Sequence, residues 1–469
     1  MNFNLSHIFI LLIISFFSNE PLLFFYSGAL FLFIVSRFWR ENEPKHLLIN
    51  LLLYWAVVSI IIPYSTIIGK SYNEITRYGK SDLKIATWIG LAALSIYIIA
   101  IQFSLKKVRT VTAFALHDLM LKYESRKLIT LYLFISIFSA LLNSSIVKIP
   151  GAQLLLSVTF FKWVILTFLI AQVAVTKDNQ KLVLIIISIE ILLSFSGFWA
   201  AFKNYIIVAI GAYLFFTPKL TLRNYLMLTL VSLLTLFISV VWTYSKGEYR
   251  RYLTGGERSQ YVIQQNELEN IFTFIKIAQN DFSASNFKSN FSEGLENLVY
   301  RISYVEFLAM TMKQVPTYLP HENGRLLQNA VEHILKPRIL FPDKKPIYDS
   351  ELTSKYTGRK FAGAEEGTSF SLGTVAEAYV DFGPIYMFVP IFIFGFWIGW
   401  MYKYFIVNGY NVLWGMCYSA PIFQFAWSFP ITTSKFLGWS VTYFITFWFI
   451  NKYLIKYIDR WLLKPEYKA

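Results

Sequence analysis

The chain of 469 residues is 56% hydrophobic and 19% aromatic, and only 15% of its residues are charged. Because soluble proteins carry about 25% charged residues, this composition excludes an ordinary soluble domain and predicts an all-α protein that crosses a membrane many times. The formal net charge of +15 is typical of membrane proteins whose lysines and arginines gather in cytoplasmic loops, so we expect the bilayer as a partner and no nucleic acid.

Apolar runs recur along most of the chain. A helix needs about 20 apolar residues to cross a hydrocarbon layer about 30 Å thick. The runs that meet or approach this length lie near 5–18, 21–38, 47–68, 85–105, 128–147, 152–175, 182–201, 203–217, 224–243, 384–405, 411–429 and 435–455. We divide 182–217 into two spans because Lys203 and Asn204 would otherwise lie in hydrocarbon. The sequence therefore predicts about twelve transmembrane helices.

These runs divide the chain into three parts. Residues 1–243 form an N-terminal transmembrane bundle of about nine spans, and residues 384–469 form about three more spans and a tail. Residues 244–383 separate the ninth and tenth spans. Lysine and arginine accumulate in the short loops on one side, which places both termini in the cytoplasm under the positive-inside rule. Residues 244–383 are therefore predicted to be a large loop on the outer side.

The large loop is predicted to be mostly helical. Leu295, Leu298 and Ile302 recur at the spacing of one helix face. We expect helices near 260–281, 292–313 and 322–336. The next stretch, to about residue 370, is expected to be irregular, and functional residues are common in such loops.

The irregular stretch contains "PRILFPDKKP", in which prolines fix the backbone around several cations. The charged residues here and just beyond are Arg338, Lys344, Lys345, Asp349, Arg359, Lys360, Glu365, Glu366, Glu377 and Asp381. Fixed cations beside carboxylates at a bilayer surface suit a lipid-linked pyrophosphate, because arginine forms paired hydrogen bonds with phosphate oxygens. The alternative is that these charges pair with one another or face solvent and form an inert surface.

At this point the sequence resembles a known family. The run "PRILFPDKKP", a polar spacer and "GTSFSLGTVAEAYVDFGPIY" leading into a transmembrane helix are similar to the large loop of Wzy-type O-antigen and exopolysaccharide polymerases. The matching residues are Pro337, Arg338, Pro342, Lys345, Pro346, Thr368, Ser369, Gly373, Glu377, Tyr379, Asp381, Phe382 and Gly383. The resemblance is specific over about 337–384 and only architectural elsewhere. One departure is Lys203, where family members often have an arginine after a Ser-Gly turn.

This resemblance implies a GT-C-like membrane glycosyltransferase of the bacterial inner membrane with a periplasmic loop. Such an enzyme moves a glycan from one undecaprenyl pyrophosphate onto a repeat unit carried by another, during O-antigen or exopolysaccharide synthesis. The implied partners are the undecaprenyl-pyrophosphate-linked oligosaccharide, a chain-length regulator and a flippase. No nucleotide motif is present, and no cofactor is expected.

Several cations are candidates for holding the pyrophosphate. Arg338 is the first choice, with support from Lys345, Arg359, Lys203, Arg250 and Arg301. For Arg301 the alternative is an ion pair with Glu296 or Glu306 one helical turn away. For Arg250 the alternative is an anchor at the lipid headgroups.

The carboxylates have different expected roles. Glu377 lies four residues before Asp381, so both share a face if this piece is helical, and Glu377 is the preferred catalytic base. Glu366 and Glu365 are alternative bases, and Asp381 is interpreted as a helix cap. His321 and His333 are isolated and Cys417 is the only cysteine, so no metal site is expected.

Other functions remain open from the sequence. A lipid-linked oligosaccharide flippase or other transporter would explain the spans, but it should place more charges inside them than Lys162 and Glu190. An O-antigen ligase would use the same donor with another acceptor. A receptor or structural membrane protein would leave the charged loop unexplained.

Overall fold

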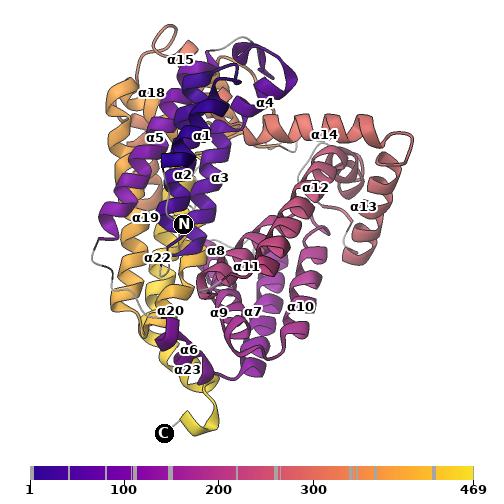
Figure 1. The fold of residues 1–469 in the computed structure, drawn as a ribbon, viewed down its shortest axis with the longest axis vertical. Coiled ribbons are helices and arrows are strands. Elements are labelled where there is room, and N and C mark those ends of the chain that lie inside the picture. Colours follow the sequence, from indigo (N-terminus) through magenta and orange to yellow (C-terminus); the bar gives the residue numbers. More distant parts are fainter. Residues whose placement is uncertain are drawn as a thin grey trace.

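The computed structural model describes residues 5–40, 43–79, 82–106, 108, 113–145, 152–217, 220–257, 262–264, 266–336, 341, 343–344, 347–363, 366, 368–424 and 429–467. Over these residues the chain is built from helices, and the β pairing is limited to one isolated bridge between Tyr123 and Leu463 (Figure 1). The prediction of an all-helical protein is confirmed.

The first half of the chain contains twelve α-helices among the described residues. They are α1 (Leu5–Ser15), α2 (Pro21–Phe38), α3 (Lys45–Ser59), α4 (Ile61–Ile68), α5 (Leu83–Ser104), α6 (Ala113–Leu121), α7 (Ser125–Ser145), α8 (Ala152–Thr159), α9 (Phe161–Thr176), α10 (Gln180–Leu193), α11 (Phe202–Phe216) and α12 (Leu222–Leu253). Local signals explain several starts. Pro21 fixes φ at the start of α2, and the side chain of Asp82 accepts a hydrogen bond from the Ile85 amide at the start of α5 (3.2 Å).

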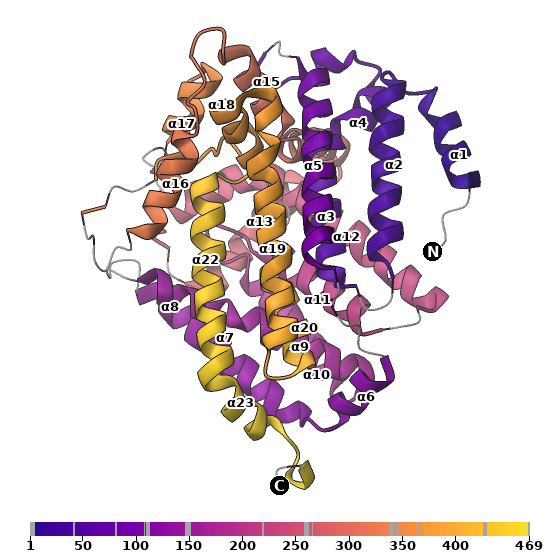
Figure 2. The ribbon, with the colours of Figure 1, turned by 90° about the vertical axis from the view of Figure 1, so that its left-hand side faces the viewer.

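The second half adds the helices of the large loop and the last spans. They are α13 (Glu267–Asp281), α14 (Phe287–Ile302), α15 (Val305–Gln314), α16 (Arg325–Leu335), α17 (Asp349–Thr357), α18 (Thr374–Tyr386), α19 (Phe388–Asn408), α20 (Val412–Cys417), α21 (Ser419–Phe423), α22 (Thr433–Phe449) and α23 (Ile455–Leu462). In Figure 2, α15, α17 and α18 lie at the upper end, and α23 and the C-terminus lie at the lower end.

Six helical stretches in the described residues are long and apolar enough to cross a membrane. They are Pro21–Phe38, Leu83–Ser104, Ser125–Leu142, Leu156–Thr176, Leu222–Leu253 and Phe388–Asn408. Counting α3 and α4 as one span bent by 47° gives seven. Three shorter apolar helices, Ser6–Ser15, Phe202–Phe216 and Val412–Phe423, also lie where spans were predicted. The chain is therefore a helical protein with several membrane-length helices.

The large loop differs from its prediction in two places. The predicted helix 292–313 is broken at Ser303, because the next amide, that of Tyr304, leaves the helix to donate to the carbonyl of Val57 in α3 (3.2 Å). Within the stretch expected to be irregular, residues 349–357 form α17. Acidic residues in its first turn favour this helix, and Gly358 in the left-handed conformation ends it.

A close helix seam joins α5 and α19, which lie side by side (Figure 2). A Cβ atom at Gly395 would lie 2.6 Å from the carbonyl oxygen of Tyr97, and one at Gly399 would lie 1.9 Å from Oγ of Ser104. Only glycine fits at these two positions, four residues apart. This small-residue spacing lets two membrane helices approach closely where the hydrophobic effect does not drive their association.

A second packing unit is formed by the turn between α10 and α11, the start of α11, α12 and α13. Its core is aromatic and includes Phe195, Phe202, Trp242, Tyr249 and Phe274. Helix α14 crosses α12 where Gly294 would place a Cβ 2.9 Å from the Val240 side chain. In Figure 1, α14 extends from this unit toward α4, where Tyr300 meets Tyr64 edge to face at 6.4 Å.

A buried ion pair lies among α7, α9, α10 and α11. Nζ of Lys162 is 2.9 Å from Oε1 of Glu190 and donates to the hydroxyl of Tyr205 (2.8 Å). Glu190 also accepts hydrogen bonds from Tyr205 (2.7 Å) and Tyr132 (3.1 Å). The two charges inside the predicted spans thus neutralise each other, which explains how an apolar bundle holds them.

This pairing predicts a large effect of single substitutions. Glu190→Gln leaves the Lys162 ammonium without its counter-charge and should lower the free energy of unfolding by about 3–5 kcal/mol. The double variant Lys162→Met with Glu190→Gln should recover most of that loss. Thermal unfolding in detergent measures both, with Glu332→Gln as a control that opens the exposed Lys336–Glu332 pair and should change little. Equal losses in the single and double variants would contradict this account.

Candidate functional site

Five basic side chains from four parts of the chain act on one another. The ammonium group of Lys246 is repelled by four neighbouring positive charges, those of Arg301, Arg250, Lys203 and Arg77. The charge of Arg301 also repels those of Lys203 and Arg250. We call these five residues the cation cluster. Lys203, Lys246 and Arg250 are half-buried, and Arg77 and Arg301 are exposed.

The aromatic packing unit positions Arg250. Its Nε donates to the carbonyl of Phe198 (3.3 Å), and its guanidinium carbon lies 4.2 Å from the Phe198 ring centre. The neighbouring Tyr249 hydroxyl donates to the carbonyl of Phe195 (2.7 Å). The turn between α10 and α11 is therefore fixed to the last turns of α12, and Lys203 follows directly in the first turn of α11. Arg250 is thus held by the turn between α10 and α11, in addition to its place in the cluster.

Four of the five cations lack a counter-ion among the residues that the structure describes. None of these has a carboxylate within salt-bridge distance of Lys203, Lys246, Arg250 or Arg301. Within the described residues, Arg301 forms no ion pair with Glu296 or Glu306. Like charges at close range repel, and the protein around them weakens the screening by water. Such a group of cations can bind an anion that carries more than one negative charge.

Glu306 fixes the loop that carries Arg77. This buried carboxylate accepts a hydrogen bond from the backbone amide of Tyr78 (2.7 Å). Burial raises the pKa of Glu306, although the amides of Tyr78 and Arg77 and the charges of Arg77 and Arg359 oppose that rise. Gly79 is needed beside it, because φ is +101° and a Cβ would lie 2.6 Å from Nη2 of Arg359. Arg359 therefore packs on the same loop.

Two carboxylates are buried at the start of α22. Oε2 of Glu377 accepts a hydrogen bond from the Thr433 amide (2.9 Å), and Oε1 is buried without a hydrogen-bond partner in the described chain. Asp349 pairs with Lys435 and accepts a hydrogen bond from Ser371 (2.7 Å). Burial raises the pKa of Glu377 to about 8, and the charge of Asp349 adds to that rise. A carboxyl group with such a pKa can gain or lose a proton near neutral pH.

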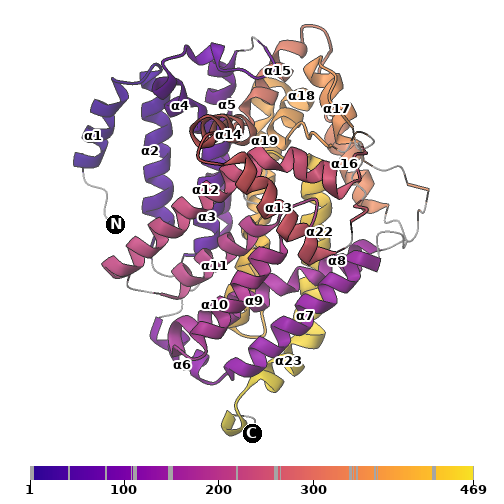
Figure 3. The ribbon, with the colours of Figure 1, turned by 90° about the vertical axis from the view of Figure 1, so that its right-hand side faces the viewer.

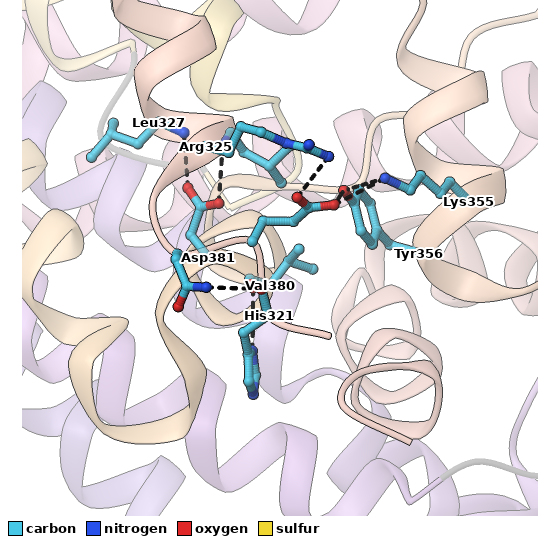
Figure 4. Close-up of polar contacts among 10 residues, drawn as sticks. His321, Arg325, Leu327, Lys355, Tyr356, Val380 and Asp381 are labelled. Carbon is cyan, nitrogen blue, oxygen red and sulfur yellow. Dashed lines mark hydrogen bonds and ion pairs between the residues drawn. The ribbon is translucent and has the colours of Figure 1, made fainter. Parts of the chain in front are cut away.

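Asp381 caps a neighbouring helix. Its two oxygens accept hydrogen bonds from the amides of Leu326 (2.9 Å) and Leu327 (2.8 Å) in the first turn of α16, and Figure 4 shows the second contact. Burial raises the pKa of Asp381 against these hydrogen bonds. The interpretation of Asp381 as the N-cap of its own helix is wrong, because Asp381 lies inside α18, whose N-cap is Gly373; it caps α16 instead, through amides that precede it in the chain by more than fifty residues.

Glu322 joins α16, α17 and α18. Its carboxylate lies 2.7 Å from Arg325 and 2.9 Å from Lys355, and it also accepts a hydrogen bond from Tyr356. Although burial opposes the effect, these contacts lower the pKa of Glu322. The adjacent His321 contacts the carbonyl of Val380 (3.2 Å; Figure 4), which supports a structural role for this histidine.

The structure brings three of the predicted phosphate-binding residues together: Lys203, Arg250 and Arg301. Arg359 lies beside Gly79 and near Glu306, and Glu366 is exposed. Arg338 and Lys345 lie outside the described residues, as do Glu365 and the motif residues Pro337, Pro342 and Pro346. Glu377 and Asp381 share a face of α18, as their spacing predicted, and both are buried.

The sequence analysis missed several residues of this region. They are Arg77, Lys246, Glu306, Glu322 and Asp349 as part of a buried pair. Lys246 could have been found, because it lies one turn before Arg250 on the same helix and therefore on the same face. The others depend on contacts between segments far apart in the chain, which no local pattern shows.

The raised pKa of Glu377 predicts a pH dependence of stability. The folded chain holds this proton more tightly than the unfolded chain, whose glutamates titrate near their ordinary pKa of about 4.3. Stability should therefore fall as the pH rises from about 4.5 toward 8, by up to about 1.4 kcal/mol for each unit of pKa difference. Glu377→Gln cannot ionise and should lose this dependence, as measured by thermal unfolding at pH 5 and pH 8. The exposed Glu366→Gln is the control. A slope unchanged in Glu377→Gln would contradict the assignment.

Repulsion within the cation cluster makes a second prediction. Arg301→Gln should raise the melting temperature at low ionic strength by a few degrees, and the gain should vanish at about 0.5 M salt because salt screens the charges. Inorganic pyrophosphate should stabilise the wild type more than this variant. Lys452→Gln, which removes an exposed cation from the other end of the molecule, should show neither effect. Destabilisation of Arg301→Gln at low salt would mean that the guanidinium has a structural role.

Comparison with known proteins gives a family but no activity. No curated protein and no solved structure matches the chain. One family model, described as Domain of unknown function (DUF8712), matches residues 80–459, a range that runs from just before α5 to α23 and contains most of the cation cluster. Because this match covers most of the sequence, the chain belongs to the DUF8712 family.

Proposed function

We propose that this protein is a membrane glycosyltransferase that polymerises oligosaccharide repeat units carried on a polyprenyl pyrophosphate. The observation that carries the proposal is the cation cluster, four of whose five basic side chains, Lys203, Lys246, Arg250 and Arg301, have no salt bridge to a carboxylate among the described residues. A diphosphate would supply the missing negative charge. The similarity of residues 337–384 to Wzy-type polymerases supports the same substrate.

The proposed reaction transfers a glycan between two lipid carriers. A hydroxyl of the acceptor sugar attacks the anomeric carbon of the donor, and the bond from that carbon to the diphosphate oxygen breaks. Its electron pair leaves with the lipid diphosphate, whose charge the cation cluster stabilises. The hydroxyl proton passes to a carboxylate, for which Glu377 is the first candidate because its pKa of about 8 is near neutral. The resemblance to Wzy-type polymerases implies Arg338 and Lys345 as further diphosphate ligands, and both lie outside the described residues.

The proposed setting is a bacterial inner membrane with about twelve spans in a GT-C-like arrangement. Both termini would be cytoplasmic and residues 244–383 periplasmic. The basic residues near the C-terminal ends of α19, α22 and α23 support this orientation, because these ends point toward the same end of the molecule (Figure 2). They include Lys403, Lys452 and Arg460.

Deletion of the gene in its host tests the proposal. Loss of long glycan chains with a single repeat unit still attached to its acceptor is the expected result, whereas loss of all surface glycan would indicate a flippase or a ligase. Complementation with Arg301→Gln should reduce the long chains by at least about tenfold, because the leaving group loses a stabilising donor. Lys452→Gln should restore them fully. Normal long chains with both Arg301→Gln and Lys246→Gln would overturn the role of the cluster.

A further inference from the structure

Helix α23 is tied at each end to a membrane-length helix. Before α23, the side-chain oxygen of Asn451 accepts a hydrogen bond from the Tyr410 amide (3.2 Å), and its amide group donates to the carbonyl of Asn408 (3.2 Å), the last residue of α19. After α23, the carbonyl of Leu463 accepts a hydrogen bond from Nζ of Lys127 (3.1 Å) in the first turn of α7. Both α19 and α7 are long and apolar enough to cross a membrane. Helix α23 therefore lies at the level where these two helices end, at the lower end of the molecule (Figure 2 and Figure 3).

One face of α23 is buried against the rest of the protein. Ile455 and Leu462 belong to the main hydrophobic core. Asp459 is buried between them and accepts hydrogen bonds from the hydroxyl of Tyr123 (2.7 Å) and from Nε1 of Trp414 (2.7 Å). These contacts fix the rotation of α23 about its axis, and they turn its one acidic side chain toward the protein.

The opposite face of α23 has a basic stripe beside an aromatic stripe. Lys456 and Arg460 are four residues apart, so they lie about 40° apart around the helix, at about 100° and 140° from Ile455. Tyr457 and Trp461 have the same spacing and lie at about 200° and 240°. All four side chains are exposed, Tyr457 by 65% and Trp461 by 43%. We call these four residues the outward face of α23.

The chemistry of the outward face is that of a membrane surface helix. Within the described residues, neither Lys456 nor Arg460 forms a salt bridge with a carboxylate. Tyrosine and tryptophan are enriched where a bilayer meets water, because each joins an apolar ring to a polar group. Cations beside such rings attract anionic head groups, and arginine can form paired hydrogen bonds with a phosphate. The position of α23 at the ends of α7 and α19 favours a bilayer over a protein partner, because the head groups lie at that level when these helices cross the membrane.

We propose that the outward face of α23 binds anionic phospholipids at the membrane surface. Tyr457 and Trp461 lie against the upper parts of the acyl chains, and Lys456 and Arg460 bind the phosphate groups of the lipids. A cation close to an anionic membrane surface strengthens binding about fivefold, so the two together select anionic over zwitterionic lipid. The site takes no part in the proposed transfer reaction and does not depend on it.

Photocrosslinking of the full chain in lipid vesicles tests the site at its own position. A benzophenone amino acid replaces Tyr457, where it keeps an aromatic ring, and for comparison Phe134, which is 65% exposed on α7. The vesicles contain equal amounts of dioleoylphosphatidylglycerol, which is anionic, and dioleoylphosphatidylcholine, which is zwitterionic. Mass spectrometry measures the ratio of the two lipid adducts, and thermal unfolding confirms that each variant is folded.

We expect phosphatidylglycerol adducts at position 457 to exceed phosphatidylcholine adducts by at least about fivefold, and a ratio near one at position 134. Lys456→Gln with Arg460→Gln should bring the ratio at position 457 close to one. Lys456→Arg with Arg460→Lys keeps both charges and should retain the preference, as should Lys276→Gln with Lys288→Gln, which removes two exposed cations from α13 and α14.

Three results would overturn the inference. They are a ratio near one at position 457 in the otherwise unchanged chain, a preference that persists in Lys456→Gln with Arg460→Gln, and cross-links mainly to a second copy of the chain. Loss of the preference in Lys456→Arg with Arg460→Lys would also contradict it, because the charge of the face is then unchanged.

Discussion

Repulsion among like charges is the constraint around which the upper part of this molecule is organised. Arg301 stands at the centre, since it acts on Lys203, Lys246 and Arg250. Cations at this density are held together only if other contacts fix their backbones. Here the aromatic core formed by the α10–α11 turn, α12 and α13 fixes Arg250, and the buried carboxylate of Glu306 fixes the loop that carries Arg77. The stability of the fold is thus used to maintain an arrangement that is electrostatically unfavourable without a ligand.

The buried acidic residues of this region differ in how completely their oxygens are paired. Glu322, Asp381 and Asp349 are occupied by hydrogen bonds or ion pairs that tie α16, α17 and α22 together. Glu377 differs from them, because one of its oxygens is buried without a partner in the described chain and its pKa is near 8. Glu377 is therefore the one of these four acids with an oxygen left for a further hydrogen bond in the described chain.

The sequence predicts the helices well because their apolar runs are long and continuous. Pro21–Phe38 matches its prediction at both ends. The sequence fails where tertiary contacts override local pattern, as at Tyr304, whose amide binds α3 and breaks a helix with regular apolar spacing. For the candidate site, the residue types were predicted and three of them meet. The residues around them, such as Arg77, Glu306 and Asp349, were missed because tertiary contacts bring them to the site. The contact between Tyr78 and Glu306 joins residues 228 apart in the chain, and the pair of Asp349 and Lys435 joins residues 86 apart.

The glycine seam between α5 and α19 has a mechanical consequence. Backbones that touch at Gly395 and Gly399 leave no room for sliding, so these two helices form a fixed frame. The unit that carries α12 joins the rest of the protein in two ways: α11 packs on α9 and α3, and α14 reaches α4, where Tyr300 and Tyr64 meet edge to face at 6.4 Å. The other helices of the protein therefore pack around a pair that moves as one rigid element.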